Sequence, residues 1–172
     1  PLQVAGAAIA FNHLEPFTLE MVTQGRPNGL KIDVRFSNHV FTEAFDPARH
    51  GRQAVEVMDG PRRRVFCPIR YGLSQALPLI IKDLPSAHVY QTPEANFLRI
   101  GVRSDGGVGD YRMFFRVKRH SGAGADLTLF VESAYSPDPG QALAIAHMSK
   151  VRFAVLVDKA LKGEKLKFHR KR

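Results

Sequence analysis

Two segments near the N-terminus alternate hydrophobic and polar residues at every second position. These segments are FTLEMVTQ (17–24) and LKIDVRFS (30–37), and the chain between them contains Pro27 and Asn28-Gly29. Proline and Asn-Gly pairs are typical of tight turns, and alternation with a period of two is typical of a strand with one buried face. The pattern therefore predicts a β-hairpin. Four residues of its second strand face the core: Leu30, Ile32, Val34 and Phe36.

The next segment predicts two short strands and then a helix. The stretch QAVEVMDGPRRRVFCPIRY has strand-like halves around an Asp-Gly turn. In the stretch SQALPLIIKDL, Ser74 is a typical N-cap, Pro78 falls in the first turn, where proline is tolerated, and Pro85 follows the end. We therefore expect one helix over residues 74–84.

From Ala87 onward the chain alternates strand-like segments with loops. HVYQT, NFLRIGVR, YRMFFRVKR and LTLFVESAY are separated by breakers such as SDGGVG and HSGAGAD, and VRFAVLV near the C-terminus is rich in β-branched residues. The whole pattern predicts an α+β fold, with a mainly antiparallel sheet of about eight strands and one helix. We expect a single domain over residues 1–172, with a loose N-terminal leader (1–15) and a basic C-terminal segment (150–172).

The composition is that of an ordinary globular domain, and it argues against several classes of protein. Of the 172 residues, 44% are hydrophobic and 24% are charged, and no apolar run approaches the roughly 18 residues of a membrane span. The single cysteine, Cys67, excludes an internal disulfide and favours a cytoplasmic protein; we expect it to be a buried, unreactive thiol. The seven histidines are scattered without metal-ligand spacing, so we expect no metal site and no cofactor.

The charge points to a polyanionic partner. The chain carries a net charge of +9, and nine of its 25 Lys and Arg residues lie in 150–172, where the acidic residues are Asp158 and Glu164. Such a basic segment is typical of proteins that bind nucleic acid. In the tail we expect four residues to contact phosphates: Lys165, Lys167, Arg170 and Lys171.

The strand DYRMFFRVKR (110–119) places cations among aromatic residues. In a hairpin with the next strand, its cationic face would lie beside Phe130, as in sheets that stack RNA bases on aromatic rings and bind phosphates with arginine. The alternative is a strand buried on both faces, with its arginines at the ends. The alternation puts four residues on the cationic face: Arg112, Phe114, Arg116 and Lys118.

Three consecutive arginines, Arg62, Arg63 and Arg64, follow the expected Asp-Gly turn. Together with Arg70 they would form a phosphate-binding loop, because guanidinium groups bind phosphate oxygens in pairs. The alternative is a solvated loop without a ligand. The residues alone favour neither.

The stretch RFSNHVF carries the groups of a metal-independent ribonuclease. Arg35, Ser37 and His39 are expected on the outward side of the second strand. Such an enzyme needs a base for the 2′-hydroxyl, an acid for the leaving oxygen and a cation for the pentavalent phosphate. We therefore single out His39 and Arg35 as catalytic residues, with His169 of the tail as a second histidine. The alternative for His39 is a surface histidine at the end of a strand.

The hairpin at residues 109–135 resembles the central hairpin of RelE/ParE-type toxins. The segments GDYRMFFRVKR and LTLFVESAY match the toxin pattern of a Tyr-Arg-aromatic-aromatic strand followed by another apolar strand, with a basic C-terminus beyond. The resemblance implies a small antiparallel sheet with helices on one side and RNA cleavage by basic and tyrosine residues. The matching positions are Tyr111, Arg112 and Arg116.

These features leave three hypotheses about function. The first is a cytoplasmic nucleic-acid-binding protein, with RNA favoured over DNA, that acts as a metal-independent endoribonuclease. The second is a non-enzymatic module whose basic segment binds RNA, DNA or an acidic protein partner. The third is a small-molecule or protein-interaction domain whose tail serves solubility alone. The spacing of basic and aromatic residues favours the first two and does not separate them.

Overall fold

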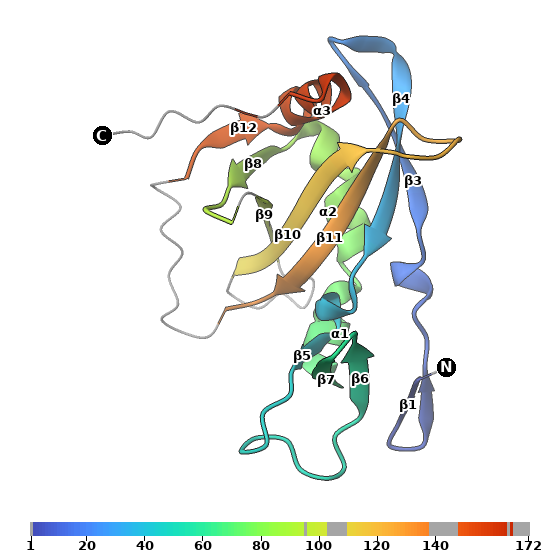
Figure 1. The fold of residues 1–172 in the computed structure, drawn as a ribbon, viewed down its shortest axis with the longest axis vertical. Helices are drawn as coiled ribbons and strands as arrows, with labels where there is room; N and C mark the ends of the chain where they lie inside the picture. The colour runs from blue at the N-terminus through green and yellow to red at the C-terminus, as the bar shows by residue number, and fades with distance from the viewer. Residues whose placement is uncertain (1, 95, 103–109, 138–147, 165, 167–172) are drawn as a thin grey trace.

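The fold is built on a curled, mainly antiparallel sheet (Figure 1). The computed structural model describes residues 2–94, 96–102, 110–137, 148–164 and 166. In this part of the chain the large sheet has seven strands in the order β12-β8-β9-β10-β11-β4-β3, and its one parallel pair is β11 with β4. The strands are β3 (Phe17–Thr23), β4 (Arg26–Phe36), β8 (His88–Gln91), β9 (Phe97–Val102), β10 (Asp110–Arg119), β11 (Leu127–Tyr135) and β12 (Lys150–Arg152).

Helices cover one face of this sheet. Figure 1 shows α2 (Leu77–Lys82) behind the sheet near β11, α1 (Pro68–Ser74) below it beside the small sheet, and α3 (Phe153–Lys162) at the upper end. The short 3-10 turn η3 (Leu84–Ser86) follows α2. The core lies between these layers, where Phe115 and Phe153 are fully buried with ring centroids 6.1 Å apart. The opposite, front face of β10, β11 and β4 carries none of the described helices, and we call it the outer face.

A small second sheet lies below the large one (Figure 1). It has the order β5-β7-β6, formed by β5 (Thr42–Ala44), β6 (Glu56–Asp59) and β7 (Arg62–Phe66). The 3-10 turn η2 (Asn38–Val40) connects it to the end of β4. The two predicted strands around the Asp-Gly turn are thus confirmed as β6 and β7.

The N-terminal residues, where we expected a loose leader, form a hairpin of β1 (Leu2–Val4) and β2 (Ala7–Ile9), followed by the turn η1 (Asn12–Leu14). The Tyr71 hydroxyl donates a hydrogen bond to the Ala10 carbonyl at 2.7 Å. The hairpin is therefore fastened at its base to α1.

The predicted helix over 74–84 corresponds to the shorter α2, and a separate helix, α1, begins at Pro68, within the segment where we expected a strand. Ser74 is the last residue of α1 and not an N-cap, since its Oγ donates to the Tyr71 carbonyl at 2.7 Å. Pro78 lies in the first turn of α2, and proline has no N–H with which to continue a helix from α1. The chain therefore leaves the first helix and starts a second one.

The predicted strand over 151–157 is wrong beyond Arg152. Strand β12 ends there, and α3 begins at Phe153. Phe153, Leu156 and Val157 are buried, and this spacing of three and four residues is that of one helical face. The β-branched residues of this segment favoured a strand in the prediction, although its hydrophobic residues are spaced as in a helix.

Candidate nucleic-acid interface

Strand β10 has the two faces that its alternation predicts. Tyr111, Met113 and Phe115 are fully buried on the core side. The alternate residues lie on the outer face and pair with residues of β11. These pairs are Arg112 with Tyr135, Phe114 with Ser133, Arg116 with Phe130, and Lys118 with Thr128.

An exposed phenylalanine lies between two arginines on this face. Phe130 of β11 is 40% exposed, although its side chain is large and apolar. It pairs with Arg116 of β10 on one side and with Arg35 of β4 on the other. Because directly paired residues share a face of the sheet, the ring has a guanidinium neighbour on each adjacent strand. We call Arg116, Phe130 and Arg35 the central row.

Carboxylates orient both arginines of the central row. Arg116 Nε lies 2.7 Å from Glu132 Oε1, and Arg35 Nε donates to Asp33 Oδ2 at 2.7 Å. Such surface pairs contribute little to stability. The two arginine side chains stay 43% and 58% exposed, so their other N–H groups are accessible to a ligand.

A pocket of about 420 Å³ opens beside Phe130. Its lining combines one aromatic ring, three cations, two hydroxyl groups and one carboxylate, which is chemistry suited to a base and its phosphate. The lining residues are Arg116, Lys118, Arg119, Ser121, Thr128, Phe130 and Glu132.

The lower end of the outer face is closed. Arg112 is only 5% exposed. Phe114 and Tyr135 stack with ring centroids 5.6 Å apart, and the guanidinium carbon of Arg70 lies 5.1 Å from the centroid of the Tyr135 ring. The alternative of a strand buried on both faces therefore holds at this end, whereas the end at Phe130 is open.

His39 lies in the turn η2 and not on the strand where we expected it. The Ser37 hydroxyl caps this turn by accepting a hydrogen bond from the His39 N–H at 3.2 Å. His39 Nε2 lies 2.8 Å from Asp59 Oδ2 of β6. The hydrogen bond from His39 lowers the pKa of Asp59, and the positive charges of His39, Arg64 and Arg62 lower it further.

The three consecutive arginines lie on strand β7 and not in a loop. Arg63 Nε donates to Glu56 Oε2 at 3.0 Å, and its guanidinium carbon lies 4.0 Å from the centroid of the Phe45 ring. Arg64 instead donates through Nε to the Thr42 hydroxyl at 2.7 Å. Successive residues of a strand point to opposite faces, so the arginines do not act as one loop.

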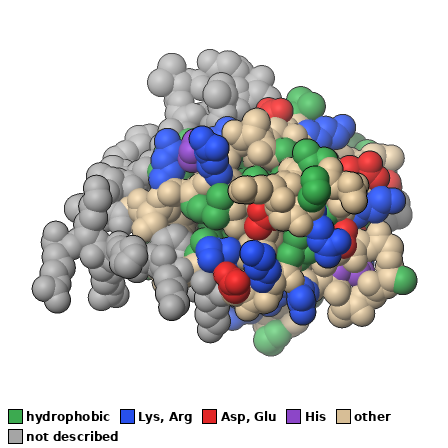
Figure 2. Space-filling view, turned by 90° about the horizontal axis from the view of Figure 1, so that it is seen from above, with side chains coloured by type: hydrophobic (Ala, Val, Ile, Leu, Met, Phe, Trp, Pro, Cys, Tyr) green, Lys and Arg blue, Asp and Glu red, His purple; other side chains and the backbone are tan. Residues whose placement is uncertain are grey.

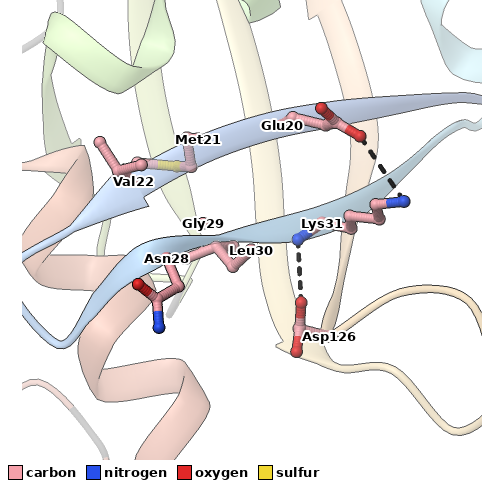
Figure 3. Close-up of a pocket in the computed structure, with 8 residues that line it drawn as sticks. All are labelled: Glu20, Met21, Val22, Asn28, Gly29, Leu30, Lys31 and Asp126. Atoms are coloured by element: carbon pink, nitrogen blue, oxygen red, sulfur yellow. Dashed lines mark hydrogen bonds and ion pairs between the residues drawn. The ribbon is translucent and has the colours of Figure 1, made fainter.

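A second hollow, of about 570 Å³, lies over the β3–β4 hairpin (Figure 3). Lys31 Nζ lies 3.6 Å from Glu20 Oε1, and Asp126 Oδ2 accepts a hydrogen bond from the Lys31 N–H at 2.9 Å. With one cation against two carboxylates, this hollow lacks the positive character of the pocket beside Phe130. Figure 2, which looks down on the upper end of the molecule, also shows acidic side chains interspersed among Lys and Arg.

The features described so far lie in a region that matches a known protein family. A model of the YjaZ family matches residues 1–161. The chain belongs to the YjaZ family. No curated protein and no solved structure matches it. The part that matches the YjaZ family contains the central row, the pocket beside Phe130 and the His39–Asp59 pair, and it ends before residues 165–172 of the basic tail.

The predicted catalytic residues of this YjaZ-family chain lie in separate places. Arg35 belongs to the central row, whereas His39 is paired with Asp59 at the small sheet. The remaining predicted tail residues lie outside the described residues: Lys165, Lys167, His169, Arg170 and Lys171.

Two residues of these clusters were not singled out from the sequence. Asp59 belongs to the Asp-Gly pair that signals a turn, but its approach to His39 depends on tertiary contact. Tyr135 is the last residue of β11, and a bulge between Phe114 and Phe115 sets its register. Neither feature has a local signal in the sequence.

The structure also bears on metal binding, on membrane-spanning helices and on the burial of the Cys67 thiol. Within the described ranges, no group of three His, Cys, Asp or Glu residues could hold a metal ion. Nor does that part of the chain contain a helix long and apolar enough to cross a membrane. Cys67 is 8% exposed, which confirms that the thiol is buried.

Proposed function

We propose that this YjaZ-family chain binds single-stranded RNA on the outer face of its sheet. The observation that carries the proposal is the central row, in which Phe130 is exposed between Arg116 and Arg35. Any unpaired base can stack on an aromatic ring, and guanidinium groups bind the adjoining phosphates. In a duplex the bases are already stacked on one another, so a single strand suits this surface better.

The charge of the protein supports a polyanionic ligand. The pocket beside Phe130 adds Lys118 and Arg119 to the arginines of the central row, and the chain as a whole carries a net charge of +9. We propose that the basic tail adds contacts to phosphates that do not depend on sequence. Such contacts make the affinity fall as salt is raised.

We propose binding without cleavage at the central row. A metal-independent ribonuclease needs its acid, base and cation around one phosphate. Arg35 and His39 belong to different clusters, which favours a binding module over the endoribonuclease. The toxin resemblance would place Tyr111 in RNA cleavage, but its side chain is fully buried, and burial raises the pKa of its hydroxyl.

We also propose that the protein works in the cytoplasm. The support is its cysteine content: the chain has the single cysteine Cys67, and this thiol is buried. Proteins of a reducing compartment rarely contain disulfides, which agrees with a single buried cysteine.

The experiment that tests the proposal compares Phe130→Ala with Leu79→Ala. Both side chains are large, apolar and exposed, but Leu79 lies on α2, behind the sheet. We expect Phe130→Ala to bind a fluorescent single-stranded RNA about tenfold more weakly, since stacking of a base contributes about 1–3 kcal/mol. Leu79→Ala should bind as the wild type does. Equal affinities of all three proteins would refute the central row as the RNA site.

Two further measurements complete the test. Arg116→Gln and Arg35→Gln should each reduce the dependence of log affinity on log salt by about 0.7, the value for one phosphate contact to a single strand. RNA incubated for hours with the wild type and EDTA should stay intact. Metal-independent cleavage that disappears in His39→Ala would instead establish the endoribonuclease.

A further inference from the structure

Two arginines from different elements converge at the junction of the two sheets. Arg64 of β7 donates through Nη2 to the Thr42 carbonyl at 3.0 Å, and Arg70 of α1 donates through Nη1 to the same oxygen, also at 3.0 Å. Arg70 Nη1 also lies 3.3 Å from the His39 carbonyl. Since two guanidinium groups share one acceptor atom, their charges lie within a few ångströms of each other.

Among the residues that the structure describes, no carboxylate lies within ion-pair distance of Arg64 or Arg70. Neither Arg64 nor Arg70 makes an ion pair there, although most other arginine pairs in the two sheets involve an acid. The nearest acidic groups are already engaged, Asp59 by His39 and Glu43 by His50 at 3.2 Å. Burial lowers the pKa of Arg64, and the charges of Arg70 and Arg62 lower it further, whereas Asp59 and Glu43 raise it and so offset part of this effect.

The other neighbours leave the site positive. Arg62 shares a face of β7 with Arg64, because the two are separated by two positions on one strand. Arg70 also lies over the Tyr135 ring, which places its guanidinium group at the end of β11. Arg62, Arg64 and Arg70 thus lie near two carboxylates, Asp59 and Glu43, each of which already has a histidine partner. The side chains of His39 and Asp59 are 26% and 36% exposed to solvent.

We propose that Arg64 and Arg70 form a phosphate-binding site at the junction of the small sheet with the end of β11. A phosphate dianion would relieve the repulsion between the two guanidinium groups. Each arginine presents a planar fork of N–H donors that matches two phosphate oxygens, and the bonds to Thr42 hold both forks in place. The site lies beyond the central row and does not depend on the RNA binding proposed above.

The first experiment uses inorganic phosphate and thermal unfolding of the full chain. If phosphate binds with a dissociation constant near 1 mM, about 20 mM phosphate should raise the Tm of the wild type by about 4 °C relative to chloride at equal ionic strength. Arg64→Gln and Arg70→Gln should lose this shift. Arg63→Gln is the matched control, because Arg63 is adjacent in sequence but pairs with Glu56 on the opposite face; it should keep the shift.

A more conservative substitution shows whether a lost shift reflects lost phosphate binding or failure of the variant to fold. Arg64→Lys keeps the charge and removes the fork, so it should fold and show a shift about half that of the wild type or less. Absence of a shift in the wild type, or an equal shift in wild type, Arg64→Lys and Arg64→Gln, would overturn the site.

The second experiment identifies the source of the phosphate. A short RNA with a 5′-phosphate should bind several-fold more tightly than the same RNA with a 5′-hydroxyl, and Arg70→Gln should remove the difference, if the site takes the end of a strand. Equal affinities of the two RNAs, with the shift by inorganic phosphate retained, would assign the site to a free phosphate compound. Loss of RNA binding in Phe130→Ala without any change in the phosphate shift would show that the two sites are independent.

Discussion

The two ends of the outer face follow the same sequence pattern and differ in exposure. At the open end, Phe130 is exposed between Arg116 and Arg35. At the closed end, Arg112 is buried and Phe114 stacks on Tyr135. Alternation with a period of two determines which residues share a face, but what packs on that face is a matter of tertiary structure. A cation on a strand is therefore evidence of a ligand only where the structure leaves it exposed.

The largest difference in the free energy of unfolding should be between variants of two phenylalanines, Phe115 and Phe130. We expect Phe115→Ala to lower the free energy of unfolding by about 4 kcal/mol, because it removes a fully buried ring that packs against Phe97 and Phe153. Phe130→Ala should lower it by less than about 1 kcal/mol. Urea denaturation of both variants tests the contrast, and similar losses would mean that Phe130 is a core residue.

A second contrast concerns arginines on the same strand. Arg112→Ala should cost about 2–3 kcal/mol, since a large side chain that is 5% exposed loses its packing and its polar interactions. Arg116→Ala, which breaks a half-exposed pair with Glu132, should cost about 0.5 kcal/mol. If Arg116→Ala is the more harmful in denaturant titrations, the assignment of open and closed ends is wrong.

The stacked pair at the closed end should show a coupling of intermediate size. Phe114 and Tyr135 lie at 18° to each other, and aromatic pairs contribute about 0.5–1.5 kcal/mol beyond the area that they bury. A double-mutant cycle with Phe114→Leu and Tyr135→Leu measures this energy. Phe130 and Tyr135 should show no coupling in the same experiment.

The smallest effect should be visible only at alkaline pH. Burial raises the pKa of Tyr111 above the unfolded value of about 10, so the hydroxyl ionises in the unfolded state first. The stability that depends on a neutral Tyr111 is therefore complete well below pH 10 and lost as the pH rises through that value, by roughly 0.4 kcal/mol at pH 10. Tyr111→Phe should abolish this loss, and Tyr90→Phe should retain it. A pH profile that is the same in wild type and Tyr111→Phe would contradict the burial of the hydroxyl.

Most of the strands could be predicted from the sequence because alternation and turn residues are local signals. The hairpin of β3 and β4 and the pair β6 and β7 follow from such signals, and so does the outer face of β10. Helices were harder, because Pro78 is compatible with both a first turn and a break, and the β-branched residues of 151–157 suit a strand as well as α3.

The candidate site could be predicted only in part. The residues of β10 were identified from alternation, and Phe130 from the expected hairpin. Arg35 reaches Phe130 through the parallel pairing of β4 with β11, for which the sequence has no local sign. The sequence suggested that Arg70 acts together with the three consecutive arginines, but the convergence of Arg64 and Arg70 on the Thr42 carbonyl depends on the way α1 packs beside the small sheet, which has no local signal.

The parallel pairing of β4 with β11 also has a consequence for how the chain folds. The hairpins β3–β4 and β10–β11 each close a short loop, whereas the seam between them joins positions as distant as Lys31 and Asp126, 95 residues apart. Closing a long loop costs more chain entropy, and such contacts form late and slow the overall rate of folding. The two hairpins should therefore gain protection from hydrogen exchange before the seam does. The pairing of β4 with β11, which brings Arg35 beside Phe130, would then be among the last parts of the fold to form.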